Sequence, residues 1–258
     1  MMLDVNGVVS TYGDTEILHN VSMELPRGKS ISLIGRNGAG KSTLFKTIYG
    51  LLKPKSGMIR YKDKEIQHLP PHRIKDLGIS YMPQGAKLFP HLTVEENIRC
   101  LTGKEQTYDL AFERLRNIFL DGISKRDSYI VRMVDSLLGA HKDQVAGTLS
   151  GGQRQVVCLV RSLIYESDLL MWDEPSIGLS HSLLPELHSL MQYLTHSGKT
   201  ILLIDQRIEW LLHATDYVFV MQKGEIKYAG GPEHLLKDRA RLLALLGLEF
   251  TPNGNRSR

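Results

Sequence analysis

The stretch Gly35-Arg36-Asn37-Gly38-Ala39-Gly40-Lys41-Ser42 decides the fold, because every position fits the pattern G-x-x-x-x-G-K-[ST]. The apolar run 31–34 before it predicts a strand, and residues 43–48 after it predict a helix. In this context backbone N–H groups curl around phosphate oxygens at the positive end of the helix. Lys41 would reach the β- and γ-phosphates, and Ser42 would offer its hydroxyl to Mg²⁺.

A glycine-rich turn that matches by accident is the alternative to this phosphate loop. At average glycine usage such a match is roughly a 1% event in a chain of this size. The strand and helix on either side make it rarer still. The predicted nucleotide-binding residues of the loop are Gly35, Arg36, Asn37, Gly38, Ala39, Gly40, Lys41, Ser42 and Thr43.

Two carboxylates, Asp173 and Glu174, directly follow the apolar stretch 169–172, which predicts a buried strand. In phosphate-loop ATPases an Asp in this place orders the Mg²⁺ shell. Glu174, one residue closer to the γ-phosphate, can polarise the attacking water as a general base. Such a pair is weak evidence alone, but beside the phosphate loop it predicts hydrolysis of ATP with Mg²⁺ as cofactor.

The composition is typical of a globular protein and does not indicate a particular partner. With 258 residues, 42% hydrophobic and 23% charged, the chain is ordinary for a globular protein of one large or two small domains. The net charge of +4 decides little, and Lys and Arg form no long run, so we expect no nucleic acid partner. Of the two cysteines, Cys158 lies in an apolar stretch that predicts a buried thiol.

The sequence offers no segment for secretion or for crossing a membrane. The N-terminus lacks the basic start and apolar stretch of a signal peptide. No apolar run approaches the roughly 18 residues that a membrane helix needs. We therefore expect any link to a membrane to pass through a partner.

The pattern of apolar residues predicts an α/β fold with two additions. Short runs near the N-terminus predict strands of an antiparallel β layer, at 3–9, 17–25, 31–34 and 58–66. From 94 to 165 the pattern is mostly helical, with apolar residues at three- and four-residue steps: Leu110, Phe112, Leu115, Ile118 and Phe119. After 167 strands and helices alternate, which predicts a parallel sheet with crossover helices, and the end, 232–246, is helical.

Together these patterns predict a phosphate-loop NTPase (RecA-like) α/β core with an N-terminal antiparallel β layer and an inserted helical subdomain. We expect one domain over 1–246, with the helical subdomain at about 91–165 and a flexible C-terminal tail over 247–258. Within the subdomain we expect a helix over 128–138, with Asp127 or Ser128 as its cap and Gly139 as its stop.

A second glycine motif, Leu149-Ser150-Gly151-Gly152-Gln153, precedes the predicted helix 154–165. A serine hydroxyl and glycine N–H groups at a helix N-terminus form another anion site. Because the phosphate loop already accounts for one ATP, this second site needs a second phosphate.

At this point the chain resembles the ATP-binding cassette (ABC) ATPases, whose signature is this LSGGQ, and the resemblance covers residues 3 to about 246. In that family two cassettes pair head to tail, and the signature of one closes on the γ-phosphate held by the other. The resemblance therefore implies that Ser150, Gly151, Gly152 and Gln153 act in trans on a second ABC ATPase subunit, in a homo- or heterodimer.

The resemblance also assigns roles to residues outside the two loops. Tyr12 matches the aromatic residue that stacks on adenine, with an exposed edge tyrosine as the alternative. Gln84 matches the glutamine that touches Mg²⁺ and relays to the membrane partner, so the implied metal-contacting residues are Ser42, Gln84 and Asp173. Residues 176–180 match the loop that contacts the partner cassette.

Gln206 departs from a common family pattern, because many ABC ATPases carry a histidine there. Glutamine cannot change its charge near neutral pH, but it can still donate and accept hydrogen bonds, and so orient water or hold the γ-phosphate. We therefore expect Glu174 and Gln206 to be the catalytic residues. The departure resembles the branched-chain amino acid transport subfamily, as do residues 81–98 and 144–149. One stretch, 121–141, looks longer than is usual; its helix 128–138 either shapes the choice of partner or decorates the surface.

We expect an ATPase on the cytoplasmic face of the cell membrane, held there by transmembrane permease subunits, that powers transport of an amino acid or similar small polar solute. One alternative is a soluble single-cassette ABC ATPase, such as one of iron–sulfur cluster assembly. Another is a nucleotide-binding protein that hydrolyses little because of Gln206. The solute, the direction of transport and the identity of the second cassette stay open.

Overall fold

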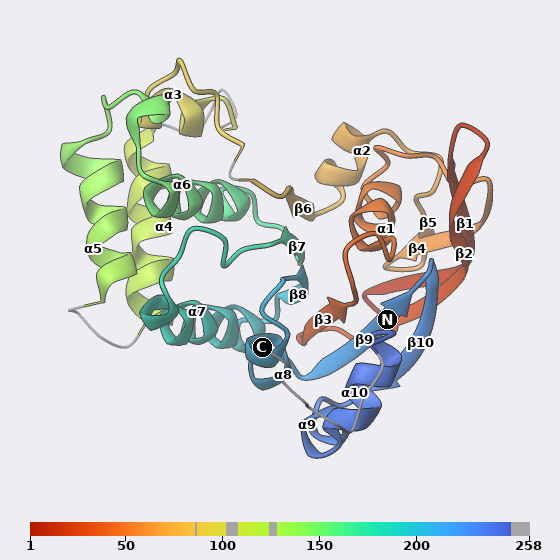
Figure 1. The fold of residues 1–258 in the computed structure, drawn as a ribbon. Helices are drawn as coiled ribbons and strands as arrows, with labels where there is room; N and C mark the ends of the chain where they lie inside the picture. Colours follow the sequence, from red (N-terminus) through yellow and green to blue (C-terminus); the bar gives the residue numbers. More distant parts are fainter. Residues whose placement is uncertain (86, 102–107, 124–127, 249–258) are drawn as a thin grey trace, which may run out of the picture.

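The structure is a computed structural model that describes residues 1–85, 87–101, 108–123 and 128–248. Asp127, one of the two predicted helix caps, and the predicted tail beyond residue 248 lie outside these residues. Figure 1 shows a central sheet, with a helical lobe that contains α3 to α6 on one side and a β layer with α1 on the other.

The N-terminal β layer is an antiparallel sheet in the order β2-β1-β4-β5. Its strands are β1 (Leu3–Tyr12), β2 (Thr15–Leu25), β4 (Ser56–Tyr61) and β5 (Lys64–Glu65). Gly13 and Asp14 turn the chain between β1 and β2, where Tyr12 pairs with Thr15. The predicted antiparallel layer is confirmed for the strands near 3–9, 17–25 and 58–66. The prediction was wrong for 31–34, which lies in the second sheet and pairs there with parallel neighbours.

The second sheet has six strands in the order β10-β9-β3-β8-β7-β6. They are β3 (Ser30–Ile34), β6 (Ile79–Met82), β7 (Leu169–Asp173), β8 (Thr200–Ile204), β9 (Tyr217–Gln222) and β10 (Glu225–Gly230). All neighbours are parallel except β9 and β10. Every residue of β3, β7 and β8 is buried, which explains why these strands read as continuous apolar runs.

Helices cover both sides of this sheet, as the alternating pattern predicted. They are α1 (Lys41–Ile48), α2 (Pro71–Asp76), α3 (Val94–Arg99), α4 (Tyr108–Gly122), α5 (Tyr129–Asp135), α6 (Gly151–Leu163), α7 (Leu184–His196), α8 (Ile208–Ala214), α9 (Glu233–Lys237) and α10 (Arg239–Leu245). Alternate residues of β7 enter two different cores: Leu170 and Trp172 pack with the helical lobe, whereas Leu169 and Met171 pack with the β layer and α1.

The observed helices correct three details of the sequence analysis. Leu110, placed on the apolar face of its helix, is 59% exposed, because the buried face of α4 runs through Ala111, Leu115 and Phe119. Gly139 does not stop the helix after α5, since a π-helical turn continues over Ser136–Ala140. The predicted helix 232–246 is broken at Asp238, whose side chain accepts the N–H of Arg241 and caps α10.

The helix predicted over 128–138 packs one face into the core. Ser128 caps it by accepting the N–H of Val131. Its residues Ile130 and Val134 are at most 1% exposed. Glu186 of α7 holds its start, accepting hydrogen bonds from Ser128 Oγ at 2.7 Å and from two backbone N–H groups.

Candidate nucleotide site

The phosphate loop lies where the sequence placed it, between the end of β3 and the start of α1. Two of its glycines are required by close approach or backbone conformation. A Cβ on Gly35 would lie 2.3 Å from the carbonyl oxygen of Met221, and Gly40 has φ +106° directly before α1. Any other residue at these positions would open the loop.

Lys41 folds back over the loop. Its Nζ donates to the carbonyl oxygens of Gly35, at 2.7 Å, and Arg36, at 3.0 Å. Burial lowers the pKa of this ammonium group, while the carboxylates of Asp173 and Glu174 oppose the shift. The loop thus contains a partly desolvated cation whose present partners are neutral carbonyls that a phosphate can replace.

Asp173 ends β7 and is 2% exposed. Burial raises the pKa of this carboxyl group, while a hydrogen bond with Ser42 lowers it. Its Oδ1 has no partner among the described residues. A buried oxygen without a partner, beside a serine hydroxyl at the start of α1, is suited to a cation.

Glu174 is held in a backbone conformation that non-glycine residues rarely adopt, with φ +59°. Its N–H donates to Ile204 O at 2.7 Å, and Gln206 Nε2 donates to its Oε1 at 2.9 Å. The other carboxylate oxygen, Oε2, is buried without a partner among the described residues. One oxygen is therefore oriented by Gln206 and the other is free to accept a proton or a water.

The phosphate loop, Glu174, Gln84 and Gln206 line one hollow. It consists of two adjoining cavities of about 380 and 370 Å³, the size of small-ligand sites. Both are lined by Lys41 and Gln206, and the larger one also by Ser42, Thr43 and Gln84. The structure thus brings together the residues expected at the phosphates.

Tyr12 does not line this hollow. It ends β1, is 46% exposed, and lies beside α1 with Lys46 Nζ 6.0 Å from the centre of its ring. Its proposed stacking on adenine depends on a base that reaches out from the phosphate loop along α1.

The signature residues form a separate site. Ser150 caps α6, where its hydroxyl accepts the N–H of Gln153, and the Gln153 side chain in return accepts the N–H of Ser150 at 2.8 Å. Ser150 and Gly152 line a hollow of about 600 Å³ with Gly178 and other residues, none from the phosphate loop. One chain therefore does not bring its own signature to its own phosphate loop.

Comparison with known proteins matches the geometry. The sequence pattern of the ABC transporter family matches residues 18–177, which is more than half of the chain. The chain belongs to the ABC transporter family. The soluble iron–sulfur alternative is not favoured, and the predicted role of an ABC transporter ATPase is confirmed.

Two relatives come from the branched-chain amino acid subfamily, which confirms that resemblance. The chain is 34% identical over 230 residues to the high-affinity branched-chain amino acid transport ATP-binding protein BraG of Pseudomonas aeruginosa, covering 87% of this chain and 91% of that protein. It is 30% identical over 258 residues to LivG of Escherichia coli, a protein of the same description, covering 95% and 98%.

Among solved structures, the ADP conformation of MJ1267, an ATP-binding cassette of an ABC transporter, has a TM-score of 0.75 and 26% identity. The match covers 96% of this chain and 99% of that one. The predicted phosphate-loop fold is confirmed by this likeness.

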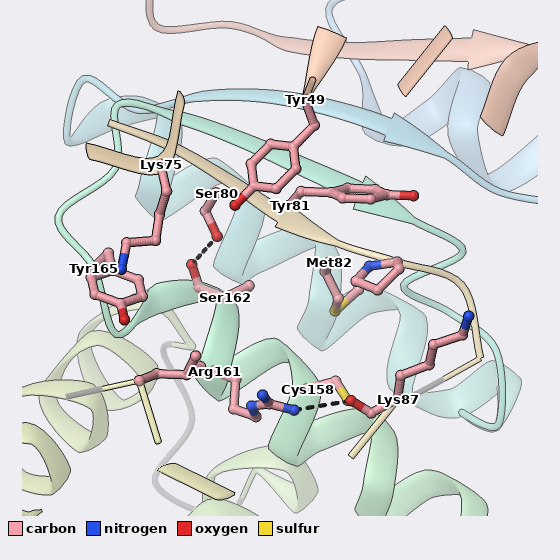
Figure 2. Close-up of a pocket in the computed structure, with 12 residues that line it drawn as sticks. Tyr49, Lys75, Ser80, Tyr81, Met82, Lys87, Cys158, Arg161, Ser162 and Tyr165 are labelled. Atoms are coloured by element: carbon pink, nitrogen blue, oxygen red, sulfur yellow. Dashed lines mark hydrogen bonds between the residues drawn. The ribbon is translucent and has the colours of Figure 1, made fainter. Parts of the chain in front are cut away.

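The cassette also contains a further cleft, between β6 and α6, that the sequence analysis did not foresee (Figure 2). It measures about 190 Å³ and includes three cationic side chains, Lys75, Lys87 and Arg161, while no carboxylate lines it. Arg161 donates to Lys87 O at 2.9 Å, and burial lowers the pKa of its guanidinium. Among the described helices of the cassette, none is long and apolar enough to cross a bilayer.

Two further site residues were missed. Gln155 of α6 is 1% exposed and donates to the carbonyl oxygens of Glu174 and Pro175. Asp205 accepts hydrogen bonds from the backbone and the hydroxyl of Ser176. A polar residue next to the apolar run after 155 was the available signal for Gln155, whereas the partner of Asp205 depends on tertiary structure.

Proposed function

We propose that this ABC cassette hydrolyses ATP only when paired with a second cassette, and that the pair drives a solute of the branched-chain amino acid class through separate membrane subunits. The observation that carries the proposal is the separation of the two anion sites. The phosphate loop lies with Glu174 and Gln206, while Ser150 lies in another hollow.

Within one cassette, Lys41 and the N–H groups of the phosphate loop bind the β- and γ-phosphates of ATP. A water then attacks the γ-phosphorus, its proton passes to Glu174, and the bond to the ADP oxygen breaks, leaving ADP and phosphate. Gln206 donates to Glu174 Oε1 and leaves Oε2 as the acceptor without a partner among the described residues. In this arrangement Gln206 orients the base without carrying a charge.

Mg²⁺ fits the residues present. Asp173 Oδ1 is a buried acceptor without a partner, and Ser42 stands beside it. Among the residues that the structure describes, no three His, Cys, Asp or Glu side chains could form a cage by themselves. A site of one carboxylate, the Ser42 hydroxyl and Gln84, completed by phosphate oxygens, is typical of Mg²⁺, which would offset the phosphate charge.

The signature of each cassette acts on the nucleotide of the other. Gly151 supports this role, because a Cβ added there would meet nothing within 4 Å, so its backbone faces open space. Gly152, in contrast, lies against Gly178, whose carbonyl oxygen would be 3.1 Å from an added Cβ. The loop 176–180 therefore supports the signature from behind, while Ser150, Gly151 and Gln153 present donors to the partner's γ-phosphate.

Tyr12 stacks on the adenine ring, and the cleft between β6 and α6 contacts the membrane subunits. The cleft supports this because it is formed by both lobes and because Met82 and Pro83, which line it, directly precede Gln84. We divide the chain into one domain over 1–246, with a helical subdomain at about 91–165. The cassette is peripheral, at the cytoplasmic face of the membrane.

The test is purification of the tagged chain from its own membranes, followed by transport in vesicles. We expect a second cassette and multi-span subunits to copurify. ATP turnover in vesicles should rise with leucine, isoleucine or valine supplied with the cognate binding protein. Copurification with soluble proteins only would overturn the transport role, and stimulation by another solute class would overturn the solute assignment.

A further inference from the structure

Gln155 joins the signature helix to the catalytic turn. It lies in α6, five residues after Ser150, so about 7.5 Å of helix separates the two positions. Its Nε2 donates to Glu174 O at 3.2 Å and to Pro175 O at 2.9 Å. These bonds connect a helix that begins at the signature with the backbone of the general base.

The amide orientation of Gln155 is set by this contact. Two carbonyl oxygens can only accept, so the NH₂ group must face them. The Oε1 atom then points to a buried position without a partner among the described residues. An unsatisfied buried acceptor costs about 1–3 kcal/mol, and generic packing would not favour a glutamine at that cost.

The turn that Gln155 contacts begins with a residue in a strained backbone conformation. Glu174 has φ +59°, and its N–H is fixed to β8 through Ile204. Gln206 fixes one carboxylate oxygen. On the carbonyl side, the N–H of Ile177 donates to Glu174 O at 3.3 Å, and Gln155 adds its bonds to Glu174 O and Pro175 O. Loss of the Gln155 amide therefore leaves the peptide after Glu174 held by one long hydrogen bond.

We propose that Gln155 is a positioning residue for hydrolysis, which transmits the docking of a partner's phosphate on Ser150 to the carboxylate of Glu174. The inference rests on the proposed function, because it requires Glu174 as the base and the signature as a trans contact. Gln155 is 1% exposed and lines neither the nucleotide hollow nor the signature hollow, so it acts through the backbone of Glu174 and Pro175.

The test compares Gln155→Met, which keeps the side-chain length and removes the donor, with Tyr108→Phe. Tyr108 is a matched control: it is 4% exposed and donates to the Leu138 carbonyl at 2.7 Å inside the helical lobe. We expect Q155M to lower kcat about 10- to 100-fold with KM for ATP unchanged, because a small misplacement of a catalytic group costs this much. Y108F should retain the wild-type kcat at a similar loss of melting temperature.

Three further measurements test the positioning role of Gln155. In a Glu174→Gln background, Q155M should have no further effect on turnover, since the base is already absent. Gln155→Asn, with a shorter reach, should lie between wild type and Q155M. In Q155M, amide hydrogen exchange should become faster in the peptide 173–179 and stay unchanged in α4.

Failure of the inference and failure of the proposed function differ. If E174Q hydrolyses ATP like wild type, the proposed function fails. If E174Q is inactive while both Gln155 variants keep the wild-type kcat, the positioning role is wrong. A Q155M variant whose kcat falls no further than that of Y108F also overturns it.

Discussion

The two anion sites of this cassette are built in opposite ways. At the phosphate loop Lys41, Asp173 and Glu174 are buried or partly buried. The shifted pKa values of Lys41 and Asp173, and the unpartnered oxygens of the two carboxylates, show groups held ready for a charged ligand. At the signature, Ser150 and Gln153 satisfy each other in a capping box and Gly151 faces open space. The first site is prepared within one chain, whereas the second needs a surface from another.

Substitution of the general base should break the first site most strongly. Glu174→Gln keeps the shape and the hydrogen bond to Gln206 but cannot accept a proton. We expect kcat to fall about 10²- to 10⁴-fold with ATP affinity unchanged. Single-turnover hydrolysis beside equilibrium ATP binding separates the two quantities. Equal, slow turnover in both proteins would mean that the chain binds ATP with little hydrolysis.

Loss of the Lys41 ammonium should instead abolish binding. Lys41→Ala removes the partly desolvated cation that faces the phosphates. We expect ATP to bind at least about 100-fold more weakly, because a hydrogen bond to a charged group contributes up to about 3 kcal/mol. Isothermal titration calorimetry measures this affinity for ATP. Lys41→Arg is the control for charge without the same reach, and a wild-type affinity in K41A would refute the assignment of the loop.

Substitution at the signature should spare binding and remove turnover. Gly151→Asp places a carboxylate in open space, where the isolated fold tolerates it but a partner's phosphate does not. We expect ATP affinity within about 2-fold of wild type and kcat at least about 10-fold lower, a loss of about 1.4 kcal/mol or more. Gly151→Ala is the matched control without charge. If G151D hydrolyses ATP normally, the two sites do not cooperate.

Gln206→His should change turnover less, and it tests what the glutamine does at a position where many ABC ATPases carry histidine. A histidine can still donate to Glu174 Oε1, so we expect kcat to change by less than about 10-fold. Its charge would titrate near pH 6.5, giving turnover a pH dependence there that wild type lacks. Turnover between pH 5.5 and 8.5 tests this, and identical pH profiles would argue against contact with the base.

The smallest expected effect concerns the stability of the nucleotide-free chain. Burial raises the pKa of Asp173 in the folded state, so its ionised form opposes folding above the unfolded pKa, and this destabilisation disappears as the carboxyl protonates at lower pH. Asp173→Asn should therefore raise the melting temperature at neutral pH by about 2–4 °C, which corresponds to an increase of about 1 kcal/mol in the free energy of unfolding. A lower melting temperature would contradict the desolvation cost assigned to this carboxylate.

Much of the fold was predictable because local patterns carry it. The phosphate loop, the buried strand before Asp173 and the signature cap all follow from short sequence stretches. The errors at Leu110 and Gly139 arose where packing decides: α4 turns Ala111 inward, and the backbone continues past Gly139 as a π-helical turn. Contacts such as Gln155 with Glu174 join residues 19 apart through the sheet edge, and no local pattern encodes them.

The central claim is that one cassette holds only half of an ATP site. It is tested most directly by measuring ATP turnover per chain together with the mass of the particle in solution, from dilute to concentrated protein and with the second cassette added. The account predicts negligible turnover while the chain is monomeric, and turnover that appears with ATP-dependent pairing. Full turnover by a preparation that stays monomeric throughout would contradict it.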